Sequence, residues 1–243
     1  MIPKIIHACW FGGKPMPKDI EKNIKTWKKF NPDYEIKIWN EKNFDFSDNK
    51  YAFEAYQSKK FAFVTDYVRL NVLFEYGGIY MDTDVEVIKP LDDFLKYPAF
   101  SGFQAPNSFP TGTMGAEANN KWIKMLLDYY NDRHFILEDG SFDLTTNVDS
   151  IMNITKSHYQ IKANNTLQSF SDFVMFPFDY FCAKSLTDGT IKKTDMTYTV
   201  HHFAGSWVTP KKKFIKFISS LFGYRFVHFL VSIKHKFKGE SDK

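Results

Sequence analysis

The stretch Phe61–Pro90, which reads FAFVTDYVRLNVLFEYGGIYMDTDVEVIKP, decides how the rest of the chain is interpreted. Its first half has apolar residues at the spacing of a helix. The predicted apolar side of that helix comprises Phe61, Val64, Val68, Leu70, Leu73 and Phe74. The pair Gly77-Gly78 then ends the helix, because glycine enters the left-handed C-terminal conformation without a Cβ clash.

Two acids follow this glycine turn. A short β-type segment, 79–81, leads into Asp82-Thr83-Asp84 and then into a second β-type run. Carboxylates two residues apart at the end of a strand can converge on one hard cation if the chain bends there. Asp66 and Arg69 share a face of the preceding helix, and they point toward these acids if the turn folds the helix back. The pattern indicates a site for a polyphosphate, a divalent metal and a hydroxyl-rich group.

Each of these two motifs also has an ordinary structural explanation. An isolated D-x-D is common in loops, and an isolated D-x-x-R is usually a surface ion pair worth about 0–1 kcal/mol. The ordered combination of helix, D-x-x-R, Gly-Gly, D-x-D and strand favours the functional interpretation. This combination resembles the sugar-nucleotide site of the DXD-containing glycosyltransferases related to yeast Och1 and to bacterial capsular polysaccharide sugar transferases (glycosyltransferase family 32-like). The large clostridial glucosylating toxins are more distantly similar. The resemblance covers residues 2–95 and returns at His201–Trp207.

The first forty residues predict a βαβ unit. Lys4–Trp10 has the apolar run of a buried strand, 17–30 has the spacing of a covering helix, and 34–39 alternates as a half-exposed strand. Ligands of such units bind at the carboxyl ends of the strands. We therefore expect an α/β fold, and the resemblance implies a Rossmann-like GT-A domain over 1–210 with a mixed, mostly parallel central sheet.

Four residues, three of them in this first part, are assigned to the nucleotide-sugar donor. Trp10 stands at the end of the first strand, where its ring can meet a base, although spacing alone favours simple core packing. The resemblance implies that Trp10 stacks on the base and that Asn40 lies near the nucleoside. We also place His7 and Tyr80 in this nucleotide-sugar site.

A β-type run at 196–203 contains two adjacent histidines near its end, His201 and His202. Neighbouring residues of a strand point to opposite faces, so one histidine could bind a metal while the other packs. Two structural histidines are the alternative. In related transferases an H-x(4)-S-W segment supplies a metal ligand and a tryptophan at the diphosphate. His201, Ser206 and Trp207 fit that spacing, with His202 as a substitute ligand.

The resemblance then implies a role for each catalytic residue. Asp84 and His201 would hold Mn²⁺ or Mg²⁺ on the diphosphate, and Asp82 would bind the metal or the ribose. Asp66 and Arg69 would hydrogen-bond the hydroxyls of the donor sugar. The expected reaction is transfer from a nucleoside diphosphate sugar, with a UDP-sugar preferred, and with retention of the anomeric configuration.

The middle of the chain is less informative. Residues 131–165 are polar and poorly patterned, and no helix or strand is assigned there. The segment Thr145–Asp149 occupies the region where family members often carry Thr-Gly-Pro, and this chain departs from that pattern. The sequence therefore identifies no residues for the acceptor.

The basic character of the chain is confined to its end. The net charge is +4, yet residues 211–239 hold eight Lys or Arg and no acid, which leaves −4 on the remainder. Apolar aromatic residues alternate with these bases, as in a basic amphipathic helix on an anionic membrane. We expect 211–243 to be a membrane-surface tail rather than a docked helix. The acidic remainder argues against nucleic acid as a partner.

Two distant cysteines, Cys9 and Cys182, and the absence of a basic, apolar leader at the start favour a reducing compartment. We therefore expect a cytoplasmic protein, peripheral at the inner face of the cell membrane. A lipid-linked glycan in capsular or other surface polysaccharide assembly is the expected acceptor. The alternatives are a toxin-like enzyme that modifies a protein, and a catalytically silent module that binds sugar nucleotides or membranes.

Overall fold

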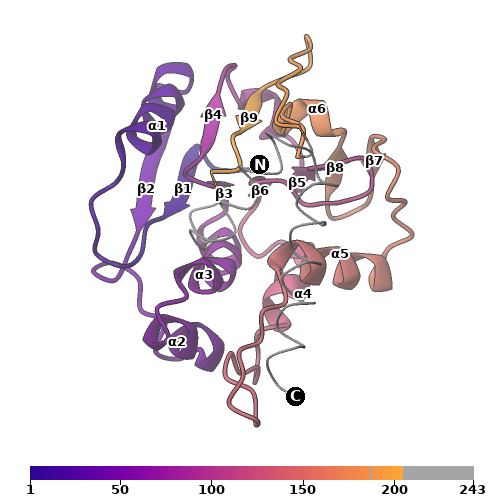
Figure 1. The fold of residues 1–243 in the computed structure, drawn as a ribbon. Coiled ribbons are helices and arrows are strands. Elements are labelled where there is room, and N and C mark those ends of the chain that lie inside the picture. The colour runs from indigo at the N-terminus through magenta and orange to yellow at the C-terminus, as the bar shows by residue number, and fades with distance from the viewer. Residues whose placement is uncertain (187, 205–243) are drawn as a thin grey trace, which may run out of the picture. The chain divides into compact units, whose positions relative to one another are not determined.

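A mixed seven-stranded sheet lies at the centre of the computed structural model, which describes residues 1–186 and 188–204 (Figure 1). Its strand order is β2-β1-β3-β6-β5-β8-β7, and β4 and β9 form a separate two-stranded sheet. The strands are β1 (Ile5–Cys9), β2 (Glu35–Trp39), β3 (Gly78–Met81), β4 (Val85–Val87), β5 (Ala99–Gly102), β6 (Thr113–Ala116), β7 (Gln168–Ser169), β8 (Val174–Phe176) and β9 (Thr199–His201). The helices are α1 (Lys18–Phe30), α2 (Lys50–Gln57), α3 (Phe61–Tyr76), α4 (Lys121–Asp128), α5 (Asn147–His158) and α6 (Phe178–Phe181), with a 3₁₀ turn, η1, at Asp92–Phe94.

The sheet has the predicted mixed, mostly parallel character. Strands β1, β2, β3, β5 and β8 run in one direction, while β6 and β7 run in the other. The predicted βαβ unit is present, since α1 connects the parallel neighbours β1 and β2. The α/β, Rossmann-like sheet expected of a GT-A domain is therefore confirmed.

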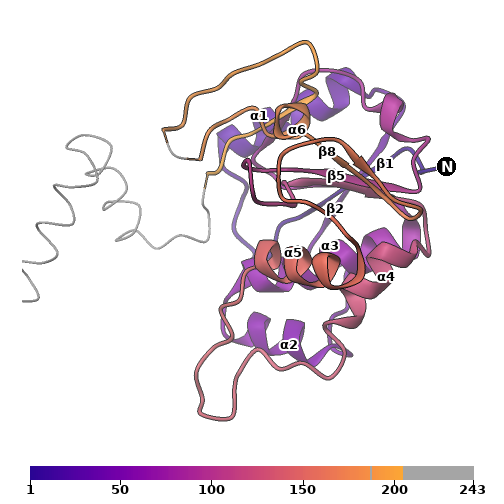
Figure 2. The same cartoon turned by 90° about the vertical axis from the view of Figure 1, so that its right-hand side faces the viewer.

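Helices cover both faces of the sheet. Figure 2 shows α1 and α6 on one face, with α3, α4 and α5 on the other and α2 beyond them. Side chains of β3 alternate between the two cores: Ile79 and Met81 pack on the α1 face, and Tyr80 packs on the α3 face. This period of two follows from the pleat of the strand, and it directs Tyr80 toward the helix that carries D-x-x-R.

The helix α3 ends where the glycine pair predicts. Gly77 has φ of 62° and ψ of −167°, and its N–H donates to the carbonyl of Leu73 at 3.0 Å. The positive φ is the feature that requires glycine, whereas the extended ψ turns the chain directly into β3. The helix is buried more widely than one apolar stripe, because it packs against β1, α2 and α4.

The poorly patterned stretch 131–165 contains a helix that the sequence analysis did not identify. Helix α5 begins after Thr146, whose side chain accepts a hydrogen bond from the Asp149 N–H at 3.2 Å and caps the helix. Thr146 and the acid three residues later form a start signal that the weak apolar pattern obscured. The segment Thr145–Asp149 therefore starts a helix in this chain.

Several predictions fall on residues that the structure does not describe. Ser206, Trp207, the domain boundary at 210 and the tail 211–243 all lie outside the described ranges. Among the helices of residues 1–186 and 188–204, none has the length and apolar character needed to cross a membrane.

Candidate active site

Pairing of β4 with β9 brings His201 close to Asp82 and Asp84. The strands are antiparallel, and Val85 lies opposite His201 in their register. The bend that D-x-D needs is a turn in which the Val85 N–H donates to the Asp82 carbonyl at 3.0 Å. The two motifs are more than a hundred residues apart, so only this pairing places them together.

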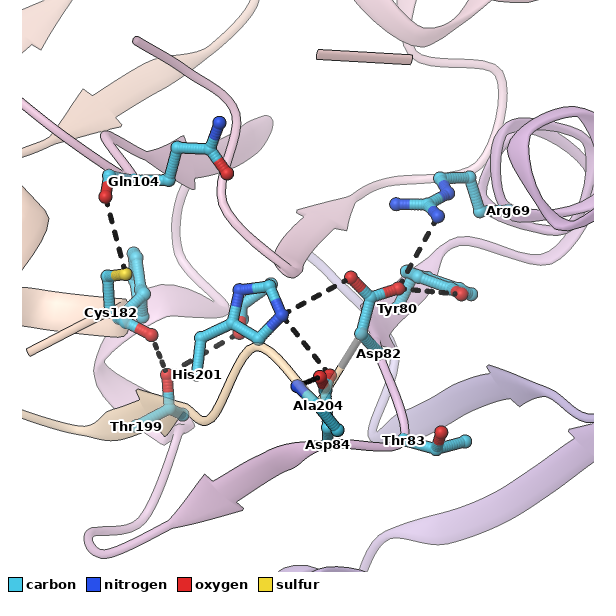
Figure 3. A network of polar contacts seen from close by, with 12 residues as sticks. Arg69, Tyr80, Asp82, Thr83, Asp84, Gln104, Cys182, Thr199, His201 and Ala204 are labelled. Carbon is cyan, nitrogen blue, oxygen red and sulfur yellow. Dashed lines mark hydrogen bonds and ion pairs between the residues drawn. The ribbon is translucent and has the colours of Figure 1, made fainter. Parts of the chain in front are cut away.

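Three side chains converge on one point at this bend (Figure 3). The His201 Nε2 lies 3.2 Å from Asp84 Oδ1 and 3.8 Å from Asp82 Oδ2. One ligand atom from each of Asp82, Asp84 and His201 lies within 4.8 Å of the other two. The predicted convergence of these three residues is therefore present in the structure.

This group fits a divalent cation. Bonds to Mg²⁺ are about 2.0–2.1 Å long, so two ligands of one such ion lie at most about 4 Å apart. The distances from His201 Nε2 to both acids are within that limit. Carboxylates suit Mg²⁺ and Mn²⁺, and neutral imidazole is a general ligand of transition metals. His201 is buried, and its Nδ1 has no hydrogen-bond partner among the described residues, which leaves the ring dependent on what Nε2 binds.

The surroundings of Asp84 lower the pKa of its carboxyl and so favour the carboxylate. Burial alone would raise the pKa of its carboxyl, but the hydrogen bond and charge of His201 lower the pKa overall. The backbone N–H of Ala204 also donates to Asp84 Oδ2 at 2.7 Å, and this contact acts in the same direction. An ionised carboxylate is the form that binds metal.

The second histidine faces away from this group. His202 Nε2 lies 3.0 Å from Glu86 Oε2, on the other face of the strand. Its backbone N–H donates to the Asp84 carbonyl at 2.9 Å. Of the two adjacent histidines, the structure brings His201 to the acids.

The D-x-x-R motif is joined to the metal acids through Arg69. Its Nη2 lies 3.1 Å from Asp66 Oδ1 and 3.4 Å from Asp82 Oδ1. The Tyr80 hydroxyl donates to the same Asp82 oxygen at 3.1 Å, and the guanidinium lies 4.8 Å from the Tyr80 ring centroid. One oxygen of Asp82 is thus fixed by helix α3 and strand β3, while its other oxygen faces His201.

Burial and neighbouring charges together shift the pKa values of Asp66 and Arg69. Desolvation raises the pKa of Asp66 to about 7, although the charge of Arg69 opposes that rise. Desolvation disfavours the charged form of Arg69 as well, but the charges of Asp82 and its other neighbours raise its pKa overall. The Arg69 Nε is buried and has no hydrogen-bond partner among the described residues. Asp66 and Arg69 thus form a buried acid–base pair beside Asp82.

Trp10 and Asn40 lie at the carboxyl ends of β1 and β2, as predicted. Trp10 is half-buried, and its Nε1 donates to the Lys14 carbonyl at 2.6 Å. The Asn40 side chain accepts from the Lys42 N–H at 2.9 Å and donates to the Ile38 carbonyl at 3.5 Å. These contacts give Asn40 a role in shaping its own turn. The contacts of Trp10 and Asn40 with a nucleotide remain predictions.

His7 lies in the core, with none of its side chain open to a ligand. Trp39 Nε1 donates to its Nδ1 at 3.0 Å, so the proton of the neutral ring is on Nε2, which lies 2.8 Å from the Gly77 carbonyl. Both ring nitrogens are used by the protein, and burial lowers the pKa of His7 to about 4. Because no polar atom of His7 remains for a ligand, we leave it out of the donor site.

Two surface grooves among the described residues are lined by residues other than these acids. One, of about 660 Å³, is lined by α4 residues, Phe74, Ile154 and His158. The other, of about 510 Å³, is formed by residues of the 41–47 loop with Phe53. The candidate active site is therefore identified by the convergence of its polar side chains and not by the volume of a groove.

Comparison with known proteins agrees with this site. Residues 17–101 match the family described as glycosyltransferase sugar-binding region containing DXD motif. That range includes the D-x-x-R and D-x-D motifs but not His201.

Individual relatives are more distant. Inositol phosphoceramide mannosyltransferase 3 of Schizosaccharomyces pombe is 33% identical over 118 residues, which cover 47% of this chain and 33% of that protein. The chain thus spans about a third of the length of this fission yeast relative. A glycosyltransferase of Acanthamoeba polyphaga mimivirus is 25% identical over 238 residues, which cover 90% of this chain and 92% of that protein. The solved structure of the PaToxG glycosyltransferase is 21% identical with a TM-score of 0.49, covering 65% of this chain and 70% of that one.

Proposed function

We propose that this chain is a metal-dependent enzyme that transfers a sugar from a nucleoside diphosphate sugar to an acceptor hydroxyl. The match of residues 17–101 to the glycosyltransferase sugar-binding region containing the DXD motif supports this proposal. The observation that carries the proposal is the convergence of Asp82, Asp84 and His201 beside the Asp66–Arg69 pair. The group of Asp82, Asp84 and His201 would bind the diphosphate end of such a donor. The Asp66–Arg69 pair, which contacts Asp82, would bind its sugar end.

The metal group would take the diphosphate end of the donor. Asp84, His201 and the outward oxygen of Asp82 would hold Mn²⁺ or Mg²⁺. A bound cation of this kind offsets the charge that develops on the departing diphosphate. Tyr80 and Arg69 would keep the Asp82 carboxylate in one orientation through its inner oxygen. By sequence resemblance, Ser206 and Trp207 would complete this end.

The Asp66–Arg69 pair would take the sugar end. Asp66 can accept a hydrogen bond from a sugar hydroxyl, and Arg69 can donate one. Two such contacts on a buried, hydrogen-bonded pair fix the orientation of the anomeric carbon relative to the acceptor. Trp10 would stack on the base. The resemblance further implies retention of the anomeric configuration.

Calorimetric titration with UDP and with GDP, each with and without Mn²⁺, tests the donor site and identifies its base. We prefer UDP, and we expect binding of one nucleotide that strengthens when Mn²⁺ is present. A mannose-bearing donor belongs in the subsequent sugar panel, because the fission yeast relative is named a mannosyltransferase. A folded protein that binds neither nucleotide would contradict the proposal.

The variant Asp84→Asn tests the metal group itself. It removes one anionic ligand with little change in size, so we expect a folded protein that has lost metal-stimulated transfer. The matched control is Glu86→Gln, two residues further along the chain in β4, where the side chain pairs with His202 and not with the metal group. Full metal-stimulated activity of Asp84→Asn would refute the assignment.

The proposed acceptor is a lipid-linked glycan in bacterial capsular or other surface polysaccharide assembly. The support is the basic, aromatic composition of 211–243, which suits a peripheral position on an anionic membrane at its cytoplasmic face. Deletion of 211–243 should then reduce sedimentation with anionic vesicles while sparing hydrolysis of the donor. Vesicle binding that survives the deletion would count against this acceptor and this location.

A further inference from the structure

Gly112 lies directly against the metal group, although no motif in the sequence marks it. Its carbonyl accepts a hydrogen bond from the Asp82 N–H at 2.8 Å. A Cβ built on Gly112 would lie 2.8 Å from Asp82 Oδ2, 2.9 Å from His201 Cε1 and 3.1 Å from His201 Nδ1. The space that this glycine leaves open is therefore bordered by two of the three candidate metal ligands.

The need for glycine at this position is steric. Gly112 is not among the residues with positive φ, so its backbone conformation is open to any amino acid. A Cβ contact below 3.0 Å, however, requires one of the touching groups to move. Alanine is the smallest substitution that would force such a movement.

Neither neighbour can move without changing the metal group. The inner oxygen of Asp82 is fixed by the Tyr80 hydroxyl and by Arg69, and its backbone is fixed to Gly112 itself. The ring of His201 lies against Phe203, with centroids 4.1 Å apart, and the backbone N–H of His201 donates to the Cys182 carbonyl at 3.1 Å. The added methyl group would act on the outer oxygen of Asp82 and on the imidazole, the two groups that now stand 3.8 Å apart.

We propose that Gly112 is a positioning residue that sets the approach of Asp82 to His201 and so selects a small divalent cation. This inference rests on the proposed metal-dependent function. Displaced ligands should bind Mn²⁺ and Mg²⁺ less well. Ca²⁺ should lose less affinity, because it accepts longer bonds of 2.3–2.6 Å and a flexible geometry.

The test is calorimetric titration of metal-free protein with Mn²⁺, and then with Ca²⁺, for the wild type and Gly112→Ala. Changes in groups that orient metal ligands cost about 10–100-fold in affinity, and we expect a loss of that size for Mn²⁺ with a smaller loss for Ca²⁺. The matched control is Gly102→Ala, whose Cβ would also meet its nearest atom at 2.8 Å, but on the ring of Phe181 in the core. The control should lose thermal stability while its affinity for Mn²⁺ stays that of the wild type.

The outcomes separate this inference from the proposed function. If the wild type does not bind Mn²⁺, the metal-dependent function fails and the inference fails with it. If the wild type binds and folded Gly112→Ala binds equally well, only the inference is overturned. If Gly112→Ala does not fold, the same exchange in a background that carries both Asp82→Ala and His201→Ala removes the two clashing side chains and should restore folding. Failure to restore folding would place the clash elsewhere and overturn the inference.

Discussion

The buried imidazole of His7 predicts a specific dependence of stability on pH. Its Nδ1 must accept the proton of Trp39 Nε1, so the folded protein holds the ring neutral. The pKa of His7 is about 4 in the folded state, against an ordinary value of 6.5 that the unfolded chain recovers. Between these values the unfolded state binds the proton and the folded state does not. The free energy of unfolding must therefore fall as the pH falls below 6.5, and this loss is complete near pH 4.

The size of the effect follows from the shift. Each pKa unit corresponds to 1.36 kcal/mol, so a shift from 6.5 to about 4 is worth about 3 kcal/mol in full. About 2 kcal/mol of this is lost by pH 5. Above pH 6.5 the ring is neutral in both states, and it contributes no slope. A few kcal/mol is a large share of the stability of an ordinary domain.

The assay is urea unfolding of the wild type and His7→Gln at intervals from pH 7.5 to pH 5. Glutamine retains a donor and an acceptor but cannot take up a proton, and other groups that titrate are common to both proteins. We expect the variant to be the less stable protein at pH 7.5, and the difference to shrink by about 2 kcal/mol at pH 5. Trp39→Phe, which removes the donor to Nδ1, should instead raise the pKa of His7 in an NMR titration. Parallel stability curves for the wild type and His7→Gln would refute the reasoning.

Two further predictions concern the candidate active site, and a third concerns the cap of α5. The variant His201→Asn should weaken Mn²⁺ binding by at least about tenfold in calorimetry, while His202→Asn should bind as the wild type does; equal losses would contradict the assignment. Tyr80→Phe removes one hydrogen bond to Asp82 and should lower the free energy of unfolding in urea by about 1 kcal/mol. The same variant should bind Mn²⁺ more weakly in calorimetry. Unchanged stability and Mn²⁺ affinity would show that the contact is dispensable. Thr146→Ala removes the cap of α5 and should cost about 1 kcal/mol of stability without altering metal affinity, which thermal unfolding and calorimetry check together.

The local elements of the site could be read from the sequence because they depend on neighbours along the chain. Helical spacing and the glycine pair predicted α3 and its end, and the bend at D-x-D follows directly from β3. The one local signal that was missed, the cap at Thr146, was present in the sequence but lay in a segment with little apolar pattern. The family match over residues 17–101 likewise rests on this continuous part of the chain.

What the sequence alone determined is therefore the α/β class and the order of the first elements, and it marked the acids and the arginine as candidate site residues. Only the tertiary structure decided which partners meet across long stretches of chain. The antiparallel register of β4 and β9 selects His201 over His202, because adjacent residues of a strand face opposite sides. Packing against Trp39 makes His7 a core residue, although the sequence analysis placed it in the nucleotide-sugar site. The space beneath Asp82 and His201 exists because Gly112 comes there from a third segment, and no spacing along the sequence records such a contact.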